Sequence, residues 1–451
     1  MLLSSYDPVM YSRMLTGLTL AFHIIFATIG VGVPLMIALA EWIGIKRNDE
    51  HYLLMARRWA RGFVITVAVG VVTGTAIGLQ LSLLWPSFMK VAGQSIALPL
   101  FMETFAFFFE AIFLGIYLYT WDRFKNKMTH FWLLVPVVIG SSASAFFITV
   151  VNAFMNAPAG ITVKDGKITD ISPFGAMLSP AMPTKVSHVL VTAYLTCAFV
   201  LAAIAAWSLL KGRNHVYYKK ALKLTMVSAF IFLISSAIIG DLSGKYLAKY
   251  QPEKLAAMEW HFETTSEAPL VLGGILTEDN EVKYGLKIPF ALSILAHGVP
   301  NAEVTGLNDI PEDEHPPLFI HYLFDLKMGF VAMMVLIASA FMLLLWRKRE
   351  LAFSNKRILR GIILAAPLAM LTIEHGWIFS EVGRQPWILR GIMRTSEGAT
   401  VSDHVDTMLW VFALLYIVLA FSSVTVLTRM FRSNSAEQEI EAKGIKGGDA
   451  E

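Results

Sequence analysis

The sequence predicts an all-α integral membrane protein that crosses the bilayer about nine times. Three observations support this fold class. Hydrophobic residues make up 56% of the 451 residues and charged residues only 16%, whereas soluble domains carry about 25% charged residues. Apolar runs as long as the roughly 20 residues that a span requires recur along the chain. Lys and Arg are also concentrated in alternate loops, as expected for loops on opposite sides of a membrane.

Nine apolar segments are long enough to cross a bilayer. They are predicted at residues 14–42, 54–84, 96–121, 130–155, 186–210, 221–246, 318–346, 358–382 and 405–431. Several exceed the minimum length, so we expect the helices to tilt or to protrude from the bilayer.

The loops that follow spans 1, 3, 5 and 7 are short and rich in Lys and Arg, while the opposite loops are longer and poorer in them. Basic loops of this kind stay in the cytoplasm. The N-terminus is therefore predicted outside and the C-terminus inside. The residues that carry this bias are Lys46, Arg47, Arg57, Arg58, Arg123, Lys125, Lys127, Lys211, Arg213, Lys219, Lys220, Arg347, Lys348, Arg349, Lys356 and Arg357.

The pattern divides the chain into four parts. Residues 1–246 hold spans 1–6, residues 247–315 form a polar loop, residues 316–432 hold spans 7–9, and residues 433–451 form a polar cytoplasmic tail. A loop of about 70 residues is unusual and tends to be functional, and the topology places it outside. The tail is expected to be solvated.

Composition also excludes some functions. The single cysteine, Cys197, lies in an apolar run, so there is neither a disulfide framework nor a CxxCH motif for covalent heme attachment. The net charge of +3 and the absence of a basic, aromatic-rich patch give no indication of nucleic-acid binding.

Polar residues inside the spans are the candidates for function, because ionisable groups there are costly and usually mark a site. The topology places His23, His188, Met328 and Glu381 in the outer parts of their spans. A His and a Met from different helices can supply both axial ligands of a low-spin heme, and His23 and Glu381 could each hold one position of a further heme. Alternatively, each histidine could bond a neighbour, and Met328 could be packing.

Two carboxylates mark a second feature. Glu103 and Glu110 are seven residues apart, so two helical turns place them on one face. This pairing on an apolar face favours a proton path or a cation site. Polar residues of span 4 could line such a path or could bond helices together: Ser141, Ser142, Ser144 and Asn152.

Several residues compete for the same roles. His321 shares a helix face with Asp325 and Met328 and could replace Met328 as a ligand. Glu374 lies seven residues before Glu381, so either carboxylate could be the ligand. Glu381 could also form only a helix-end ion pair with Arg384. A row of glycines in span 2 allows close approach of a helix or a flat macrocycle: Gly70, Gly74 and Gly78. Three histidines in the basic loops are expected to face solvent: His51, His130 and His215.

Five strings occur together in the chain: "GWIFSEVGRQPW", "KLAAMEW", "GDLSG", "METFAFFFE" and "WDR". With them, the chain resembles subunit I of the cytochrome bd quinol oxidases over essentially all of its membrane part. The resemblance implies a bacterial cytoplasmic-membrane oxidase that oxidises quinol at the outer face and reduces O2 to water with cytoplasmic protons. Such an enzyme contributes to the proton motive force without pumping. It also implies a second membrane subunit and sometimes a very small third one.

The resemblance implies residue roles and three cofactors, a low-spin heme b, a high-spin heme b and heme d. His188 and Met328 match the low-spin heme ligands, and His23 and Glu381 match the ligands of the two high-spin hemes. Glu103 and Glu110 match residues that deliver protons. Lys254 and Glu259 match quinol-contacting positions of the outer loop, the Q-loop, which here resembles the family's shorter type.

Further residues near "GRQPW" follow from the same resemblance. Trp377 is expected to pack beside Glu381 or to relay electrons, and three arginines at the outer surface could partner heme propionates: Arg384, Arg390 and Arg394. The chain departs from the family at Lys327, where an arginine often precedes the ligating Met. Lys cannot make the bidentate contacts of Arg.

Two other functions remain open on the sequence. A proton- or ion-coupled transporter could use Glu103 and Glu110, although transporters tend to show repeats and broken helices at the midplane. A heme-bearing electron relay that does not reduce O2 would share the ligands of an oxidase.

Overall fold

The computed structural model describes residues 6–164 and 167–445. Within these ranges nine helices are long and apolar enough to cross a membrane, which confirms the predicted fold class and number of spans. They are α1 (Pro8–Arg47), α2 (Glu50–Leu84), α3 (Pro86–Tyr119), α4 (Lys127–Asn156), α6 (Met182–Leu210), α7 (Val216–Tyr250), α10 (Ile320–Arg347), α12 (Lys356–Val382) and α14 (Val405–Ser433).

Capping residues explain where several of these helices begin. The side chains of Asp7, Asp49, Asn126 and Asn355 accept hydrogen bonds from the first backbone N–H groups of α1, α2, α4 and α12, which stabilises the helix starts. Many helices extend past the predicted spans. As a result, His23 lies near the middle of α1 and Glu103 near the middle of α3, farther from the outer helix ends than His188 or Met328.

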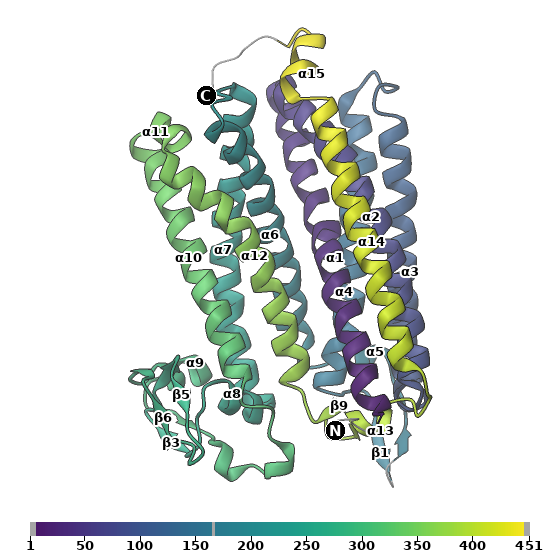
Figure 1. The fold of residues 1–451 in the computed structure, drawn as a ribbon, viewed down its shortest axis with the longest axis vertical. Helices are drawn as coiled ribbons and strands as arrows, with labels where there is room; N and C mark the ends of the chain where they lie inside the picture. The colour runs from purple at the N-terminus through teal and green to yellow at the C-terminus, as the bar shows by residue number, and fades with distance from the viewer. Residues whose placement is uncertain (1–5, 165–166, 446–451) are drawn as a thin grey trace.

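The long helices run side by side along the longest axis of the molecule (Figure 1). Helix α6 contacts α1, α4, α7 and α12 and so joins the first four helices to the later ones. Small residues permit the α1–α6 contact. A Cβ added at Gly32 would lie only 2.5 Å from the carbonyl oxygen of Ala193 and from Sγ of Cys197.

The segment between α7 and α10 is folded. It contains α8 (Pro252–Met258), α9 (Ala291–His297), the 3₁₀ turns η1 (Leu307–Asp309) and η2 (Glu312–Glu314), and three two-stranded antiparallel sheets. The paired strands are β3 (Thr265–Ser266) with β8 (Glu303–Val304), β4 (Leu270–Leu272) with β7 (Leu286–Ile288), and β5 (Ile275–Leu276) with β6 (Val282–Lys283).

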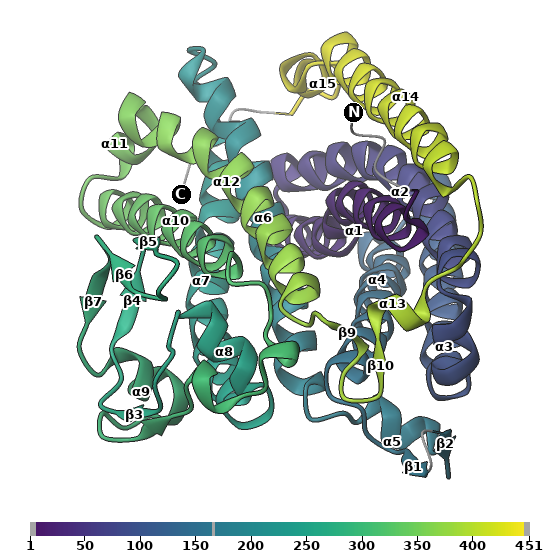
Figure 2. The same ribbon diagram turned by 60° about the horizontal axis from the view of Figure 1, so that its bottom comes forward.

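Shorter elements complete the chain. They are the β1 (Thr162–Lys164) and β2 (Lys167–Thr169) pair, α5 (Pro173–Met177), α11 (Arg349–Ser354), the β9 (Trp387–Leu389) and β10 (Met393–Arg394) pair, α13 (Thr395–Gly398) and α15 (Ala436–Ala442). The folded loop and the β9–β10 hairpin lie at one end of the bundle, and α11 and α15 lie at the other (Figures 1 and 2).

The prediction of a solvated tail is wrong for α15, although residues 446–451 lie outside the described part. Ser435 and Gln438 form a capping box at the start of α15. The Glu439 carboxylate accepts hydrogen bonds from Arg58 and Arg61 of α2, and Ile440 is buried. Contacts with a distant helix therefore order this polar segment.

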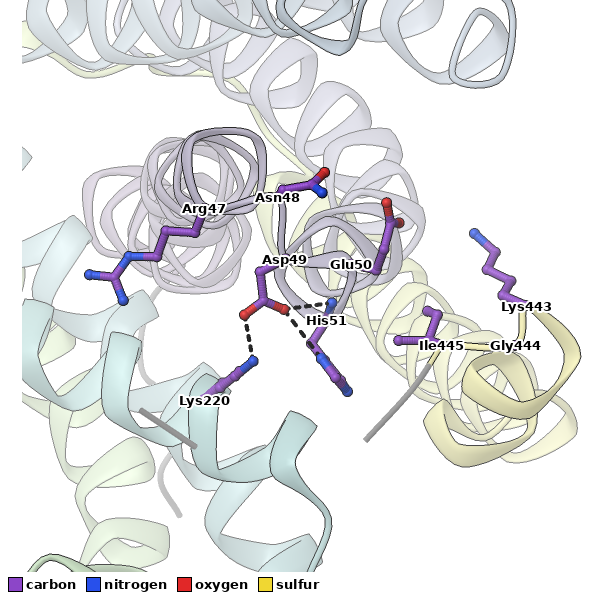
Figure 3. A pocket seen from close by; sticks show the side chains of 9 residues that line it. All are labelled: Arg47, Asn48, Asp49, Glu50, His51, Lys220, Lys443, Gly444 and Ile445. Carbon is purple, nitrogen blue, oxygen red and sulfur yellow. Dashed lines mark hydrogen bonds and ion pairs between the residues drawn. The ribbon is translucent and has the colours of Figure 1, made fainter. Parts of the chain in front are cut away.

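The prediction that His51 and His130 face solvent is also wrong, because both side chains are buried. Asp49 accepts hydrogen bonds from the backbone N–H and Nδ1 of His51 and from Lys220 (Figure 3). These groups line a cavity of about 720 Å³ between α2, α7 and the residues after α15. His130 instead contacts Glu41, at 3.1 Å from Nδ1. His215 is only partly buried.

Candidate functional site

His23 on α1 is oriented by a hydrogen bond to Thr73 of α2. Its Nδ1 lies 2.8 Å from Oγ1 of Thr73, which itself donates to the carbonyl of Val69 at 2.9 Å. With the Thr73 hydroxyl donating to Val69, Thr73 accepts from Nδ1–H, and this tautomer leaves Nε2 with a free lone pair. Gly74 lies beside the ring, and a Cβ there would be 3.3 Å from Cε1. A neutral imidazole held by a partner on its other nitrogen is how proteins present a histidine to iron.

His188 lies in the second turn of α6 and Met328 in the third turn of α10, toward the end of the bundle that carries the folded loop. Nδ1 of His188 is buried and has no hydrogen-bond partner. The Met328 side chain is not enclosed by the chain, since the residue is 42% exposed. An unpartnered buried nitrogen is costly, so His188 is poorly explained as a packing residue.

Glu381 stands at the last turn of α12 and is held from two sides. Oε1 accepts a hydrogen bond from Asn152 of α4, and Oε2 accepts one from Arg384 at 2.6 Å. The predicted ion pair with Arg384 is therefore present. Glu381 nevertheless keeps 30% of its side chain exposed, and Nη1 of Arg384 is buried without a partner, so the pair does not satisfy either group completely.

Two lysines, the partly buried Lys185 and the buried Lys254, converge on Ser380, the residue before Glu381. Nζ of Lys185 donates to the side chain of Asn152 at 2.7 Å and to Oγ of Ser380 at 3.1 Å. Nζ of Lys254 donates to the Ser380 carbonyl at 3.0 Å. Elements α4, α6, α8 and α12 therefore meet at this point.

Lys327 lies next to this group. Its Nζ is 4.6 Å from the ring centre of Phe324 and 5.2 Å from that of Phe379, a ring that Lys254 also faces at 4.7 Å. These cation–π contacts stabilise the charges only in part. Trp377 is partly buried, and no described residue makes a hydrogen bond or ring contact with it.

Arg390 and Arg394 are engaged elsewhere, in contrast to the suggestion that they partner heme propionates. Arg390 forms a bidentate pair with Glu253 at 2.7 and 2.9 Å. Arg394 pairs with Asp313 at 2.5 Å. Both guanidinium groups thus tie the β9–β10 hairpin to the loop segment.

Glu103 and Glu110 both face α4, as their spacing predicts. Oε1 of Glu103 accepts from Ser144 at 3.0 Å. Glu110 is buried and packs at Gly140, where an added Cβ would lie 3.0 Å from Cβ of Glu110. Along this helix pair the two carboxyl groups are about 10 Å apart, from seven residues at 1.5 Å each.

In the folded loop, Lys254 and Glu259 lie at opposite ends of α8 and are both buried. Burial raises the pKa of Glu259 well above its usual range, and the charge of Asp325 raises it further. The Val271 amide opposes this shift without forming a well-aligned hydrogen bond. Burial, followed by the charge of Lys185, lowers the pKa of Lys254 well below its usual range.

A cavity of about 140 Å³ opens beside Glu259. It is lined by Glu259, Trp260, His261, Phe262, Glu263, Thr265, Pro269, Val271, Val282 and Lys287. Burial also lowers the pKa of His261. The loop therefore offers a small pocket with aromatic walls and a buried carboxyl group.

The rival ligands fare differently. His321 is fully buried, and its ring nitrogens contact the carbonyls of Met258 and Gly273, at 2.7 and 3.3 Å, and Asp325 at 3.2 Å. No lone pair is left for iron, which disfavours His321 as a substitute for Met328. Glu374 has a buried, unpartnered Oε1 and remains an alternative to Glu381.

The candidate ligands fit hemes better than a bare metal ion. Among the described residues no three His, Cys, Asp or Glu side chains gather as a metal-ion site requires. A heme supplies four ligands to its own iron, so one or two protein ligands suffice. The free lone pair of His23 and the unpartnered nitrogen of His188 fit that need.

Sequence reasoning missed Lys185 and a buried group formed by Glu41, Tyr117 and His130. Lys185 lies one turn before His188 at the start of a span. This position in the sequence could have indicated that Lys185 belongs to the site. Tyr117 donates to Glu41 at 2.6 Å. Tyr117 lies seven residues after Glu110 and so on the same helix face, and this spacing was the only indication of the buried group in the sequence.

Known proteins match the chain over nearly its full length. The family model for cytochrome bd terminal oxidase subunit I matches residues 11–435. The putative cytochrome bd menaquinol oxidase subunit I of Bacillus subtilis is 40% identical over 444 residues, covering 96% of this chain and 99% of the relative. The cytochrome bd ubiquinol oxidase subunit 1 of the same organism is 29% identical over 92% of each. The bd oxidase structure from Geobacillus thermodenitrificans has a chain 67% identical to this one, with a TM-score of 0.91, covering 95% of this chain and 99% of that one.

Proposed function

Because the chain belongs to the cytochrome bd terminal oxidase subunit I family, it is a subunit of a quinol oxidase, and we propose that it carries the oxygen-reducing centre. In this proposal it oxidises quinol at the outer face and reduces O2 to water with cytoplasmic protons, without pumping. The end of the bundle that carries the folded loop is then extracytoplasmic, and the end with α11 and α15 is cytoplasmic (Figure 1).

The residues that would hold the cofactors follow from the site. His188 and Met328 would hold a low-spin heme b, while His23 and Glu381 would each hold one of a high-spin heme b and a heme d. When bound, the hemes carry electrons from quinol to O2. The hydrogen bond from His23 to Thr73 and those from Asn152 and Arg384 to Glu381 keep these ligands in place.

The folded loop supports a role in quinol oxidation. Oxidising a quinol releases two protons, and a buried carboxylate such as Glu259 can accept one of them. Lys254 can donate a hydrogen bond to a quinol oxygen, since its present acceptor is only the Ser380 carbonyl. The Lys254 contact with Ser380 also places the loop directly against the helix end that carries Glu381.

Protons for water formation would reach the oxygen-binding side along α3 and α4. Glu110 lies deeper than Glu103, and both face α4, where Ser144 contacts Glu103. Proton transfer between two carboxyl groups about 10 Å apart requires bridging waters. This arrangement would supply protons from the cytoplasm rather than from the outer surface.

The protein is a multi-pass membrane protein, and a subunit I implies a subunit II as its partner. We infer a bacterial cytoplasmic-membrane location with the N-terminus outside and the C-terminus inside, and a possible place for a very small third subunit. Many large apolar side chains of α3, α10 and α14 are exposed on this chain alone, which leaves surface for lipid and for other subunits.

The unpartnered Nδ1 of His188, at the same end of the bundle as the exposed side chain of Met328, is the observation that carries this function. His188→Ala in the purified complex should remove the low-spin heme b absorption while the other heme bands persist. An unchanged spectrum would refute this ligand assignment. Loss of every heme band together with the partner subunit would indicate a folding role instead.

A second experiment separates quinol oxidation from oxygen reduction. Glu259→Ala should impair quinol oxidase activity, measured as O2 consumption, by at least about tenfold. Activity with the artificial electron donor TMPD should be largely kept, because that donor does not need the loop. Equal loss of both activities would contradict a quinol-specific role for Glu259.

A further inference from the structure

Four basic side chains, from α6, α8, α10 and the turn after α12, lie around the end of α12 that carries Glu381. We call Lys185, Lys254, Lys327 and Arg384 the outer cation cluster. Arg384 pairs with Glu381 at 2.6 Å. None of the three lysines forms an ion pair with a described carboxylate. They contact the oxygens of Asn152 and Ser380 and the rings of Phe324 and Phe379.

Other carboxylates near the cluster do not balance it. Glu253 is bidentate to Arg390, and Asp325 accepts from the Gly273 amide and contacts His321. Burial favours the neutral acid form of Glu259, because it raises that pKa. Glu374 lies two turns deeper on α12, about 10 Å away. Glu381 is already paired with Arg384, so Lys185 and Lys327 have no ion-pair partner among the described carboxylates in this partly enclosed region.

Unpaired charge removed from water is strongly destabilising. A bound molecule that supplies negative charge would stabilise the charged form of these lysines. Two of the lysines are also adjacent to the proposed low-spin heme ligands. Lys185 precedes His188 by one helical turn, and Lys327 is the residue before Met328.

We propose that Lys185 and Lys327 bind the carboxylate groups of the heme held by His188 and Met328. This inference rests on the proposed function, and it assigns the propionate contacts to these lysines rather than to Arg390 and Arg394. A heme of the b type carries two propionates, which matches the two lysines in number and in charge. Lys254 keeps its proposed role in the loop, and Arg384 keeps its ion pair with Glu381.

The test is an equilibrium redox titration of the low-spin heme band in the purified complex, combined with the ratio of heme to protein. Lys185→Met and Lys327→Met each remove one positive charge close to the heme. Reduction adds an electron to the heme, so losing a nearby cation disfavours the reduced form. At the potential where the wild type is half reduced, the ratio of reduced to oxidised heme should fall about tenfold, or 59 mV for one electron.

Matched variants separate charge from packing. Lys185→Arg and Lys327→Arg should titrate near the wild type, and Arg394→Gln, which breaks the pair with Asp313, should leave the heme unchanged. Loss of the low-spin heme in the Met variants but not in the Arg variants also supports the proposal. Unshifted titrations with full heme content in both Met variants would overturn it, as would equal heme loss in the Met and Arg variants. A wild-type complex without heme would instead refute the proposed function.

Discussion

At the scale of single residues, hydrogen bonds within the chain decide which atoms are available to a ligand. Thr73 accepts a hydrogen bond from Nδ1–H of His23 when its own hydroxyl donates to the Val69 carbonyl. His321 has no ring nitrogen available to a ligand, because both nitrogens already contact carbonyl or carboxylate oxygens. Spacing in the sequence could not distinguish these two histidines, since their partners come from other segments.

Thr73→Val should weaken binding of the heme that is proposed at His23. It removes the acceptor that fixes the imidazole, and loss of such a partner typically costs about 10- to 100-fold in metal affinity. Heme content after dilution or detergent washing measures the effect. Thr75→Val is the control, because the Thr75 hydroxyl bonds only the Val71 carbonyl of its own helix. Equal heme retention in both variants would contradict this role for Thr73.

The raised pKa of Glu259 predicts how quinol oxidation depends on pH. The carboxyl group accepts a proton only when ionised, and below its raised pKa it is neutral. The rate should therefore rise with pH over a range well above the usual carboxyl pKa. This rising limb should be absent in Glu259→Gln, which cannot titrate. Steady-state rates between pH 5 and pH 9, a range of roughly two units either side of neutral, would show it. A limb that persists in Glu259→Gln belongs to another group.

At the scale of elements, apolar patterning located all nine spans but not their ends. The helices continue outside the apolar runs, as in α1, which begins at Pro8 after the Asp7 cap. The tail illustrates the reverse error. Residues 436–442 are polar enough to be predicted as solvated, yet α15 forms because Glu439 meets Arg58 and Arg61 of α2. Such partners cannot be identified before the helices are placed in space.

Glu439→Gln should release α15 from the bundle. The substitution weakens charge-assisted hydrogen bonds to two arginines, each worth on the order of 1 kcal/mol when partly buried. Hydrogen exchange of the α15 amides should accelerate several-fold, while the long helices should be unaffected. Glu441→Gln is the matched control, because Glu441 is exposed on the same helix. Equal exchange rates in the two variants would contradict the claim that Glu439 holds α15 against α2.

At the scale of the whole molecule, the positions of three candidate ligands along their helices were easier to predict from the sequence than the residues around them. His188, Met328 and Glu381 do lie toward one end of the bundle, since each is near that end of its helix. Lys185 was missed, and the ion pairs of Arg390 with Glu253 and of Arg394 with Asp313 were not predicted. Pairing between charged groups depends on how α4, α6, α8 and α12 converge, which no single segment reveals.

The reduced-minus-oxidised absorption spectrum of the complex, purified with its partner subunit, tests the central claim most directly. An oxidase built on His23, His188, Met328 and Glu381 should show a low-spin heme b band together with the red chlorin band of heme d. A heme b band without the chlorin band would indicate an electron relay. A spectrum without any heme band would contradict the account and favour a transporter that uses Glu103 and Glu110.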